Sequence, residues 1–288
     1  MLYDVIIIGG GPAGISASLY LKRAKINVLV INKGYGALEK AEKIENYYGL
    51  EKSISGKELF EVGQNQAKRL GIEFVYDEVI GIDFEESFKI ITVNSEYFAK
   101  KVVLATGTNR KSPNIKGIKE YEGRGISYCA VCDAFFYKDK DVAVLGNGDY
   151  AIHEAEQLKP IVKDVTILTN GEKIIENRDE IDFNIEDRPI REFRGTDRIE
   201  EIEFENSEKK NISGVFIAVG TASSSDLARK IGAIIKDNNI VVNENMQTNI
   251  DGLYACGDCT GGILQINKAV YEGAKSALHI IATLKNEK

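Results

Sequence analysis

The stretch Asp4–Gly14, which reads DVIIIGGGPAG, sets a run of β-branched residues directly before a glycine-rich turn and the start of a helix at Pro12. Its glycines follow the pattern Gly9-x-Gly11-x-x-Gly14. Glycines at this spacing allow a tight turn and a close approach of the backbone to a pyrophosphate, whose charge the N-terminus of the helix stabilises. A glycine turn without a ligand is the alternative, but the strand before it and the helix after it favour dinucleotide binding.

The same pattern occurs a second time in the chain. Residues Asp141–Gly148 (DVAVLGNG) align with Asp4–Gly11 without a gap, and the second glycine pattern is Gly146-x-Gly148-x-x-Ala151. Short apolar runs separated by helical stretches are typical of parallel sheets. Two such starts predict an α/β protein with two Rossmann-like nucleotide-binding domains, each built around one glycine loop.

Two further apolar stretches, 102–107 and 215–220, each read as a buried strand that ends on glycine. The turn-forming residues that follow them are suited to crossings between domains. We therefore expect the second domain to be inserted in the first. The first domain would comprise residues 1–112 and 220–288, and the inserted domain residues 113–219.

The composition is that of a soluble globular protein, with 288 residues of which 43% are hydrophobic and 28% charged. The formal net charge of −7 gives no overall attraction to nucleic acid or to an anionic membrane, so we expect neither as a partner. The N-terminal residues lack the basic and apolar regions of a targeting signal, and no apolar span has the length of a membrane helix. We therefore expect a cytoplasmic protein.

The residues at two strand ends weaken the nucleotide prediction. Asn32 stands where an acid would bind ribose hydroxyls, and an amide can donate and accept there but carries no charge. In the second unit the strand ends at Thr169-Asn170-Gly171, without an acid for NAD or an arginine for the 2′-phosphate of NADP. For the second loop, the sequence leaves open whether the nucleotide site is functional or has been lost.

The four cysteines form two CxxC pairs, Cys129/Cys132 and Cys256/Cys259. In a reducing compartment such pairs indicate redox chemistry or a metal site. The interval between the pairs is far longer than the roughly 15–20 residues of a zinc ribbon, so we predict no metal. For the second pair we favour small, partly buried residues, and a secondary thiol relay stays open.

Several motifs, taken in order, resemble those of the low-molecular-weight thioredoxin reductase family over nearly the whole chain. The segment Cys129–Asp133 (CAVCD), followed by FFY at 135–137, is the most specific. It is similar to the redox-active CxxC and acid that the family carries directly before its second nucleotide fold. The other matching segments are Gly9–Gly14, Glu45–Tyr47 with Gly49, Ala105–Gly107 and Gly257–Asp258.

The resemblance implies a flavoprotein whose first domain binds FAD. The residues that would contact FAD are Gly9, Gly11, Pro12, Ala13, Gly14, Asn32, Asn46, Ala105, Thr106, Gly107, Gly257, Asp258, Gln265 and Ile266. The implied activity is reduction of thioredoxin by a Cys129/Cys132 dithiol, with Cys132 facing the flavin and Cys129 attacking the partner disulfide. Asp133 would act as general acid and base for the thiols.

The resemblance also carries expectations about motion and assembly. The redox pair and the FAD would belong to different domains. We therefore expect a rotation about the two linkers that presents Cys129 and Cys132 to the flavin and to thioredoxin in turn. We also expect a homodimer.

The departures from the family concern the electron donor. Members that use NADPH carry a His-Arg-Arg cluster after the strand of the second unit, where this chain has Thr169–Lys173 (TNGEK). The Gly-Gly-Gln that usually follows the second FAD strand appears as Tyr35–Leu38 (YGAL), and the C-terminal Arg-Gln as Leu264-Gln265. The pattern looks more like the ferredoxin-dependent flavin thioredoxin reductases, so we expect ferredoxin as the donor.

Three alternatives stay open. The residual loop of Gly146, Gly148 and Ala151 would serve an NADPH- or NADH-dependent reductase. A dithiol oxidase of the same fold would pass its electrons to oxygen instead of to thioredoxin. The third alternative is a regulator without catalytic activity that binds zinc or a nucleotide.

Overall fold

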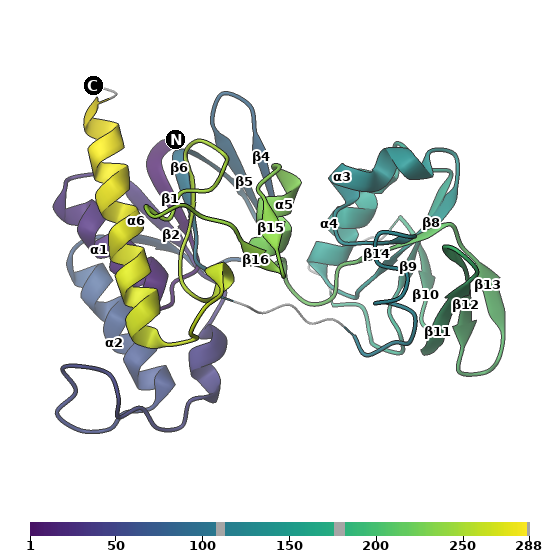
Figure 1. Cartoon of the computed structure of the whole chain (residues 1–288), viewed down its shortest axis with the longest axis horizontal. Helices are drawn as coiled ribbons and strands as arrows, with labels where there is room; N and C mark the ends of the chain where they lie inside the picture. Colours follow the sequence, from purple (N-terminus) through teal and green to yellow (C-terminus); the bar gives the residue numbers. More distant parts are fainter. Residues whose placement is uncertain (108–112, 176–181, 287–288) are drawn as a thin grey trace. The chain divides into compact units, whose positions relative to one another are not determined.

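The computed structural model describes residues 1–107, 113–175 and 182–286. Within these ranges the chain forms the helices α1–α6, three short 3₁₀ helices and the strands β1–β17, most of which are labelled in Figure 1. A strand precedes each glycine loop and a helix follows it, as the sequence predicts.

The chain divides into two compact units. Unit 1 comprises Met1–Asn109 together with Ser223–Lys288, and unit 2 comprises Arg110–Ala222. The domain boundary predicted at 112/113 falls at residues 108–112, which lie outside the described ranges. The boundary predicted at 219/220 lies close to Ala222, where unit 2 ends.

Unit 1 is built on a sheet with the strand order β3-β2-β1-β6-β5-β4, and β17 also pairs with β6. The strands β3, β2, β1, β6 and β17 pair with one another in parallel, whereas β4, β5 and β6 form an antiparallel meander. The bounds are β1 (Leu2–Ile8), β2 (Val28–Ile31), β3 (Glu73–Val75), β4 (Val79–Phe84), β5 (Phe88–Thr92), β6 (Glu96–Leu104) and β17 (Leu253–Ala255).

Two helices complete the main core of unit 1. Ile7, Val103, Leu21 and Ile280 belong to one buried apolar cluster, which joins the sheet to α1 and α6. A Cβ on Gly273 of α6 would lie 2.1 Å from a backbone oxygen of α1, so the two helices touch at their backbones. The helices and short strands of unit 1 have the bounds α1 (Pro12–Arg23), η1 (Gly36–Lys40), α2 (Gly56–Arg69), α5 (Ser224–Lys230), β15 (Ile235–Lys236), β16 (Asn239–Ile240), η3 (Asp258–Thr260) and α6 (Ile266–Asn286).

Unit 2 repeats the parallel arrangement with the strand order β10-β9-β8-β14-β7. All four pairings in this sheet are parallel. The elements are β7 (Ile126–Ser127), α3 (Ala130–Asp133), η2 (Ala134–Tyr137), β8 (Asp141–Leu145), α4 (Asp149–Leu158), β9 (Asp164–Leu168), β10 (Asn184–Glu186) and β14 (Gly214–Ile217). The redox segment therefore lies between β7 and β8, directly before the second glycine loop.

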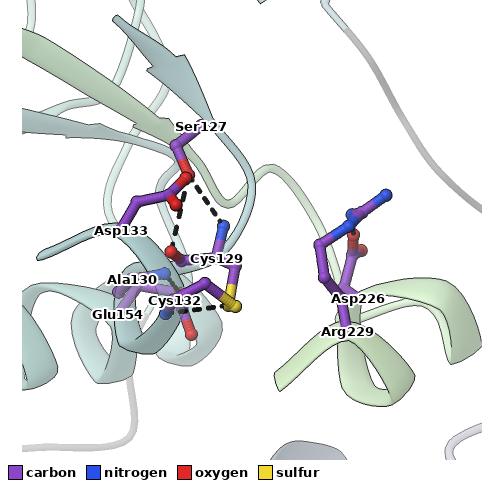
Figure 2. The surroundings of a disulfide bond; sticks show 8 residues. All are labelled: Ser127, Cys129, Ala130, Cys132, Asp133, Glu154, Asp226 and Arg229. Carbon is purple, nitrogen blue, oxygen red and sulfur yellow. Dashed lines mark hydrogen bonds and ion pairs between the residues drawn. A yellow bond between two sulfur atoms is a disulfide. The ribbon is translucent and has the colours of Figure 1, made fainter. Parts of the chain in front are cut away.

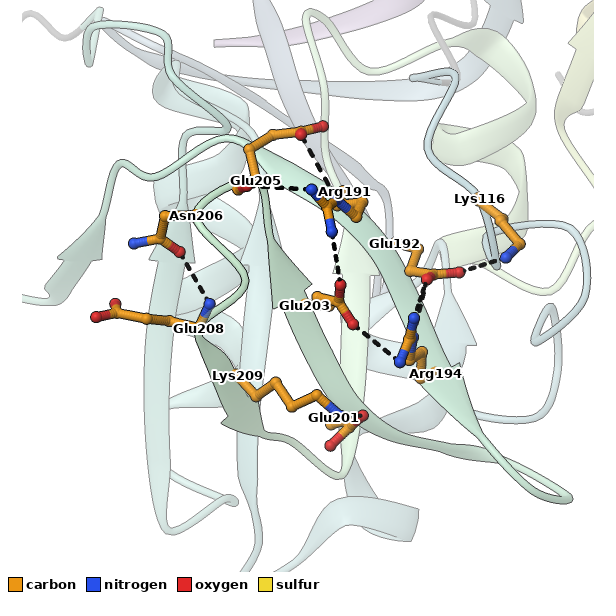
Figure 3. Close-up of polar contacts among 10 residues, drawn as sticks. All are labelled: Lys116, Arg191, Glu192, Arg194, Glu201, Glu203, Glu205, Asn206, Glu208 and Lys209. Atoms are coloured by element: carbon orange, nitrogen blue, oxygen red, sulfur yellow. Dashed lines mark hydrogen bonds and ion pairs between the residues drawn. The ribbon is translucent and has the colours of Figure 1, made fainter.

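A second sheet of unit 2 is antiparallel and consists of β11 (Ile190–Gly195), β12 (Ile199–Phe204) and β13 (Lys209–Asn211). Ion pairs cross it, as Figure 3 shows. Arg191 and Arg194 of β11 both bind Glu203 of β12, at 3.0 and 2.9 Å. The two arginines are half-exposed but Glu203 is buried, and opposite charges on neighbouring strands favour this register.

Each unit has a set of parallel strands in which a glycine loop and a helix follow β1 or β8, and this confirms the predicted α/β class with two Rossmann-like units. The second unit is contiguous and divides the first, so the predicted insertion is also observed. Among the helices of the described ranges, none combines the length and the hydropathy that crossing a membrane requires.

Candidate functional site

The first glycine loop, Gly9–Gly14, joins β1 to α1 and is packed against the end of β6. Gly9 has a φ of +112°, and a Cβ on it would lie 2.4 Å from the carbonyl oxygen of Ala105. A Cβ on Gly14 would lie 1.9 Å from the carbonyl oxygen of Gly9. Both positions require glycine, because any side chain would meet backbone atoms that have no room to move.

Gly11 differs from these two glycines because it faces open space. No heavy atom beyond its chain neighbours lies within 4 Å of a Cβ built on it. It is the N-cap of α1 and makes no side-chain capping bond, Pro12 follows it, and the first turn contains no acidic residue. The positive end of α1 is thus open to an anion, which fits the pyrophosphate of a dinucleotide.

Asn32 lies directly after β2 and is 4% exposed. Its Oδ1 accepts a hydrogen bond of 2.9 Å from the backbone N–H of Gly10. The side chain predicted to contact a ribose therefore also holds the glycine loop to the sheet. This second role has no signal in the sequence, because it depends on the distance between two separate strand ends.

Replacing Asn32 with alanine is expected to lower the free energy of unfolding by about 1–3 kcal/mol, because the buried N–H of Gly10 loses its acceptor. Urea unfolding followed by circular dichroism measures this change. Asn32→Asp is the matched control, since a carboxylate keeps an acceptor near the positive end of α1. An alanine variant as stable as the unaltered protein would contradict the role.

The other predicted FAD segments of unit 1 follow neighbouring strands. Ala105–Gly107 follows β6 and Gly257–Asp258 comes shortly after β17, so both lie at the same sheet edge as Gly9–Gly14. A Cβ on Gly257 would lie 3.0 Å from the Cβ of Ala13, which brings the last segment against the first. Three of the predicted segments thus meet at the carboxyl edge of the parallel strands, where open α/β sheets bind ligands.

The remaining predicted contacts lie elsewhere in unit 1. Asn46 is exposed in the loop between η1 and α2. Gln265 is exposed directly before α6, and Ile266 is the first residue of that helix. Contacts of these three residues with FAD stay predictions.

An ion pair on α6 holds the loop of Gly257 and Asp258. Glu272, which is 8% exposed, accepts a hydrogen bond of 2.8 Å from the N–H of Gly257. Lys268 donates to the carbonyl oxygen of Gly257 at 2.8 Å and pairs with Glu272 at 3.2 Å. Burial raises the pKa of Asp258, and the charge of Lys268 opposes that shift. The only sequence signal for this pair is a lysine and a glutamate four residues apart.

In unit 2, Cys129 and Cys132 form a disulfide bond (Figure 2). Cys129 is the N-cap of α3, and its Sγ accepts a hydrogen bond of 3.2 Å from the N–H of Cys132. Cys129 is 1% exposed, whereas Cys132 lies at the surface. A donor on the Cys129 sulfur stabilises a thiolate once the disulfide is reduced, so the local structure favours Cys129 as the nucleophile.

Two residues that the sequence does not indicate, Ser127 and Glu154, are bonded to the segment Cys129–Asp133, as Figure 2 shows. Asp133 ends α3, and its Oδ2 accepts a hydrogen bond of 2.6 Å from the hydroxyl of Ser127. The same hydroxyl accepts a bond of 3.1 Å from the N–H of Cys129. Glu154 of α4, which is 2% exposed, accepts a bond of 3.1 Å from the N–H of Ala130 and connects α4 to the redox helix.

The second cysteine pair is buried in unit 1, and Cys256 and Cys259 are both free thiols. The thiol of Cys259 donates to the carbonyl oxygen of Cys256 at 3.3 Å. Burial raises the pKa of Cys259 to about 12 and that of Cys256 well above its ordinary value, so neither thiol ionises at neutral pH. In the part of the chain that the structure describes, no three His, Cys, Asp or Glu side chains are grouped to hold a metal ion.

The second glycine loop is contacted by another segment of unit 2. The backbone oxygen of Asn147 accepts a bond of 2.6 Å from the N–H of Ile175, and its Nδ2 donates to the carbonyl oxygen of Lys173 at 2.9 Å. Asn170, after β9, accepts a bond of 2.7 Å from the N–H of Ile190. Polar groups of this loop and of the next strand end are therefore bonded to other segments of unit 2.

Comparisons with known proteins match the chain from end to end. It matches the pyridine nucleotide-disulphide oxidoreductase family over residues 3–273. The thioredoxin reductase of Aquifex aeolicus (strain VF5) is 37% identical over 100% of this chain and 95% of its own length.

Two solved structures are similar over 99% of both chains. One is an atypical thioredoxin reductase, TRi, from Desulfovibrio vulgaris Hildenborough, with 38% identity and a TM-score of 0.94. The other is a ferredoxin-flavin thioredoxin reductase from Clostridium acetobutylicum, with 33% identity and a TM-score of 0.71. Thioredoxin reductases of this kind are FAD-dependent flavoproteins, so the predicted cofactor is confirmed. The chain belongs to the pyridine nucleotide-disulphide oxidoreductases and, within them, to the low-molecular-weight thioredoxin reductase family.

Proposed function

We propose that this protein reduces thioredoxin through its Cys129/Cys132 pair, with FAD as cofactor and reduced ferredoxin as electron donor. The observation that carries the proposal is the disulfide at the N-terminus of α3, with the sulfur of Cys129 accepting an N–H and Cys132 at the surface. A cytoplasmic homodimer is part of the proposal, and analytical ultracentrifugation measures its assembly.

The residues of unit 1 fit FAD at the edge described above. Gly9–Gly14 would hold the pyrophosphate at the N-terminus of α1, where Gly11 leaves room for it. Asp258 would accept hydrogen bonds from hydroxyl groups of the cofactor, in a loop that Glu272 and Lys268 hold in place. When bound, FAD supplies the electron pair that converts the disulfide to a dithiol.

The reduced pair would act by thiol–disulfide exchange. The thiolate of Cys129 attacks the thioredoxin disulfide and forms a mixed disulfide. Cys132 then attacks the sulfur of Cys129, which releases reduced thioredoxin and restores the internal disulfide. Because Cys129 is 1% exposed in the oxidised structure, this order requires that Cys129 become accessible after reduction.

The surface around the redox pair suits a protein substrate. Val131, Phe135 and Phe136 are 46%, 75% and 71% exposed and lie within four residues of the pair in the sequence. Large apolar side chains that gather at the surface mark interaction sites, and aromatic residues are enriched at the centres of interfaces. This surface supports a macromolecular disulfide such as that of thioredoxin over a small dithiol.

The second glycine loop supports ferredoxin rather than a nicotinamide nucleotide as donor. Asn147 is bonded to Lys173 and Ile175, and the strand end at Thr169-Asn170 offers neither an acid nor an arginine. The energetics also suit ferredoxin. Plant-type ferredoxins lie near about −400 mV and thioredoxin near about −270 mV, so two electrons fall by roughly 130 mV, which is about 6 kcal/mol.

An NAD(P)H-dependent reductase is the second candidate. One observation favours it, since Gly148 is the N-cap of α4 without a side-chain capping bond, as Gly11 is for α1. A nucleotide would then have to displace the contacts of Lys173 and Ile175 from the loop.

Mixing the oxidised flavoprotein anaerobically with reduced ferredoxin, NADPH or NADH in parallel decides between the donors. We expect reduced ferredoxin to bleach the visible flavin band and support thioredoxin reduction, and micromolar NADPH or NADH to bleach it slowly or not at all. Rapid bleaching by NADPH would overturn the assignment of the donor. Peroxide formed in air from small dithiols, without thioredoxin reduction, would instead indicate the dithiol oxidase.

A further inference from the structure

The hydroxyl of Ser127 lies between the two ends of the redox helix. Its oxygen accepts a bond of 3.1 Å from the N–H of Cys129, which caps α3, and it donates at 2.6 Å to Oδ2 of Asp133, which ends α3 (Figure 2). Ser127 is 6% exposed. One buried hydroxyl therefore connects the first and last residues of the segment that carries the disulfide.

The sheet fixes the position of this hydroxyl. Ser127 is the last residue of β7, which pairs in parallel with β14 in a register that sets Ser127 opposite Phe216. Phe216 is 1% exposed in the core of unit 2. The pairing places the backbone of Ser127 in the sheet, and its side chain joins the sheet to both ends of α3.

The hydroxyl has three contacts, because its oxygen also lies 3.4 Å from the carbonyl oxygen of Cys129, a longer contact than the 2.6 Å to Asp133. The two contacts with the backbone of Cys129 are ordinary local features. A serine that accepts a bond from the N–H two residues later forms a common local turn, so the bond from Cys129 needs no functional explanation. The bond to Asp133 lies outside that turn. Its length of 2.6 Å is typical of a hydroxyl that donates to a carboxylate, which is stronger than a bond between neutral groups.

We propose that Ser127 is a positioning residue, which holds the carboxylate of Asp133 in the orientation that exchanges protons with the Cys129/Cys132 pair. The inference rests on the proposed function, because it assumes that Asp133 transfers protons during thiol–disulfide exchange. Ser127 itself touches neither sulfur in the described bonds and acts through Asp133.

The protons and electrons of the exchange balance as follows. The Cys129 thiol gives its proton to Asp133, and the resulting thiolate bonds to one sulfur of the partner. The partner S–S bond breaks, and the departing sulfur takes that proton from Asp133. Asp133 takes the proton of the Cys132 thiol, and Cys132 then bonds to Cys129 while the mixed disulfide breaks. Asp133 returns its proton to the second departing sulfur. The dithiol has then lost two electrons and two protons to the partner, and Asp133 is unchanged.

A double-mutant cycle separates this role from a structural one. The variants are Ser127→Ala, Asp133→Asn and both together, with Ser127→Thr as the rescue and Ser18→Ala as the control for loss of a buried hydroxyl. Each full-length flavoprotein is reduced with dithiothreitol, freed of excess reductant and mixed with an oxidised thioredoxin that contains tryptophan. Because this chain has no tryptophan, the fluorescence change reports thioredoxin alone.

We expect Asp133→Asn to slow the exchange by roughly 100-fold, Ser127→Ala by roughly 10-fold, and the double variant by no more than Asp133→Asn alone. Ser127→Thr should recover most of the rate, since threonine keeps the hydroxyl, and Ser18→Ala should not slow the exchange. If Ser127→Ala slows the exchange further when Asp133 is already asparagine, Ser127 acts independently and the inference is wrong.

A small aromatic disulfide in place of thioredoxin makes the two possible failures distinguishable. If the unaltered dithiol reacts with the small disulfide but not with thioredoxin, the proposed function fails, and the same cycle with the small disulfide still tests Ser127. If it reacts with both and the cycle is additive, only the inference fails. Should Ser127→Ala not fold, Ser127→Cys replaces it, because a thiol is a weaker donor in the same position.

Discussion

Replacing Cys132 with serine is expected to trap thioredoxin on Cys129 as a stable mixed disulfide. The N–H of Cys132 would still donate to the sulfur of Cys129, which keeps its thiolate reactive, but no second thiol would be available to resolve the adduct. Steady-state reduction of thioredoxin should fall by at least about 1,000-fold in this variant and in Cys129→Ser, because the two sulfurs act as a unit. Mass spectrometry of the unreduced mixture measures the adduct, and oxidation of the donor measures turnover.

The adduct should be absent from Cys129→Ser, and also from the variant in which both residues are serine. The double variant is the matched control, because it retains Cys256 and Cys259, whose burial keeps them protonated. A stable adduct in Cys129→Ser would reverse the roles of the two sulfurs. That outcome has a structural basis to be tested, since Cys132 is the more exposed of the two.

Replacing Gly14 with alanine is expected to remove at least about 3 kcal/mol from the free energy of unfolding, because its methyl group would meet the carbonyl oxygen of Gly9 at 1.9 Å. The atom in the way is backbone at the bottom of the glycine loop, so α1 itself would have to move. Urea unfolding of the FAD-free proteins measures the loss, and FAD content after purification measures the consequence for the cofactor.

Gly11→Ala is the matched control at the other end of the same loop. Its methyl group would enter open space, and the φ of −80° at this position suits alanine, so the stability of the FAD-free protein should change by no more than about 0.5 kcal/mol. FAD affinity should nevertheless fall by roughly 10-fold or more, since the methyl group would occupy the space left for the pyrophosphate. Unchanged FAD affinity in Gly11→Ala would show that the pyrophosphate lies elsewhere.

The features that the sequence predicted well are local ones. A strand followed by glycines and a helix is encoded within about a dozen residues, so the stretch Asp4–Gly14 and its repeat at Asp141–Gly148 are enough to predict the parallel strands of both units. The strand predicted at 215–220 corresponds to β14, which ends at Ile217. The antiparallel sheet of β11, β12 and β13 was not predicted, because its charged residues alternate with only a few apolar ones.

The features that the sequence did not predict depend on contacts between distant residues. The bond from Ser127 to Asp133 forms only once β7 has joined its sheet, and the contact of Glu272 with Gly257 requires α6 to fold back over β17. The bonds of Asn147 to Lys173 and Ile175 likewise join a loop to a segment that no pattern connects to it. The spacing of motifs in the sequence does not predict such contacts.

The division of unit 1 by unit 2 has a consequence for synthesis on the ribosome. Unit 2 is one continuous segment and can acquire its core as soon as it has left the exit tunnel. Unit 1 completes its fold later, because β17 and α6 are translated only after the whole of unit 2. These two elements complete its sheet and pack with α1. During that interval unit 2 of the nascent chain is folded while unit 1 is incomplete, and the apolar strands of unit 1 are exposed to chaperones.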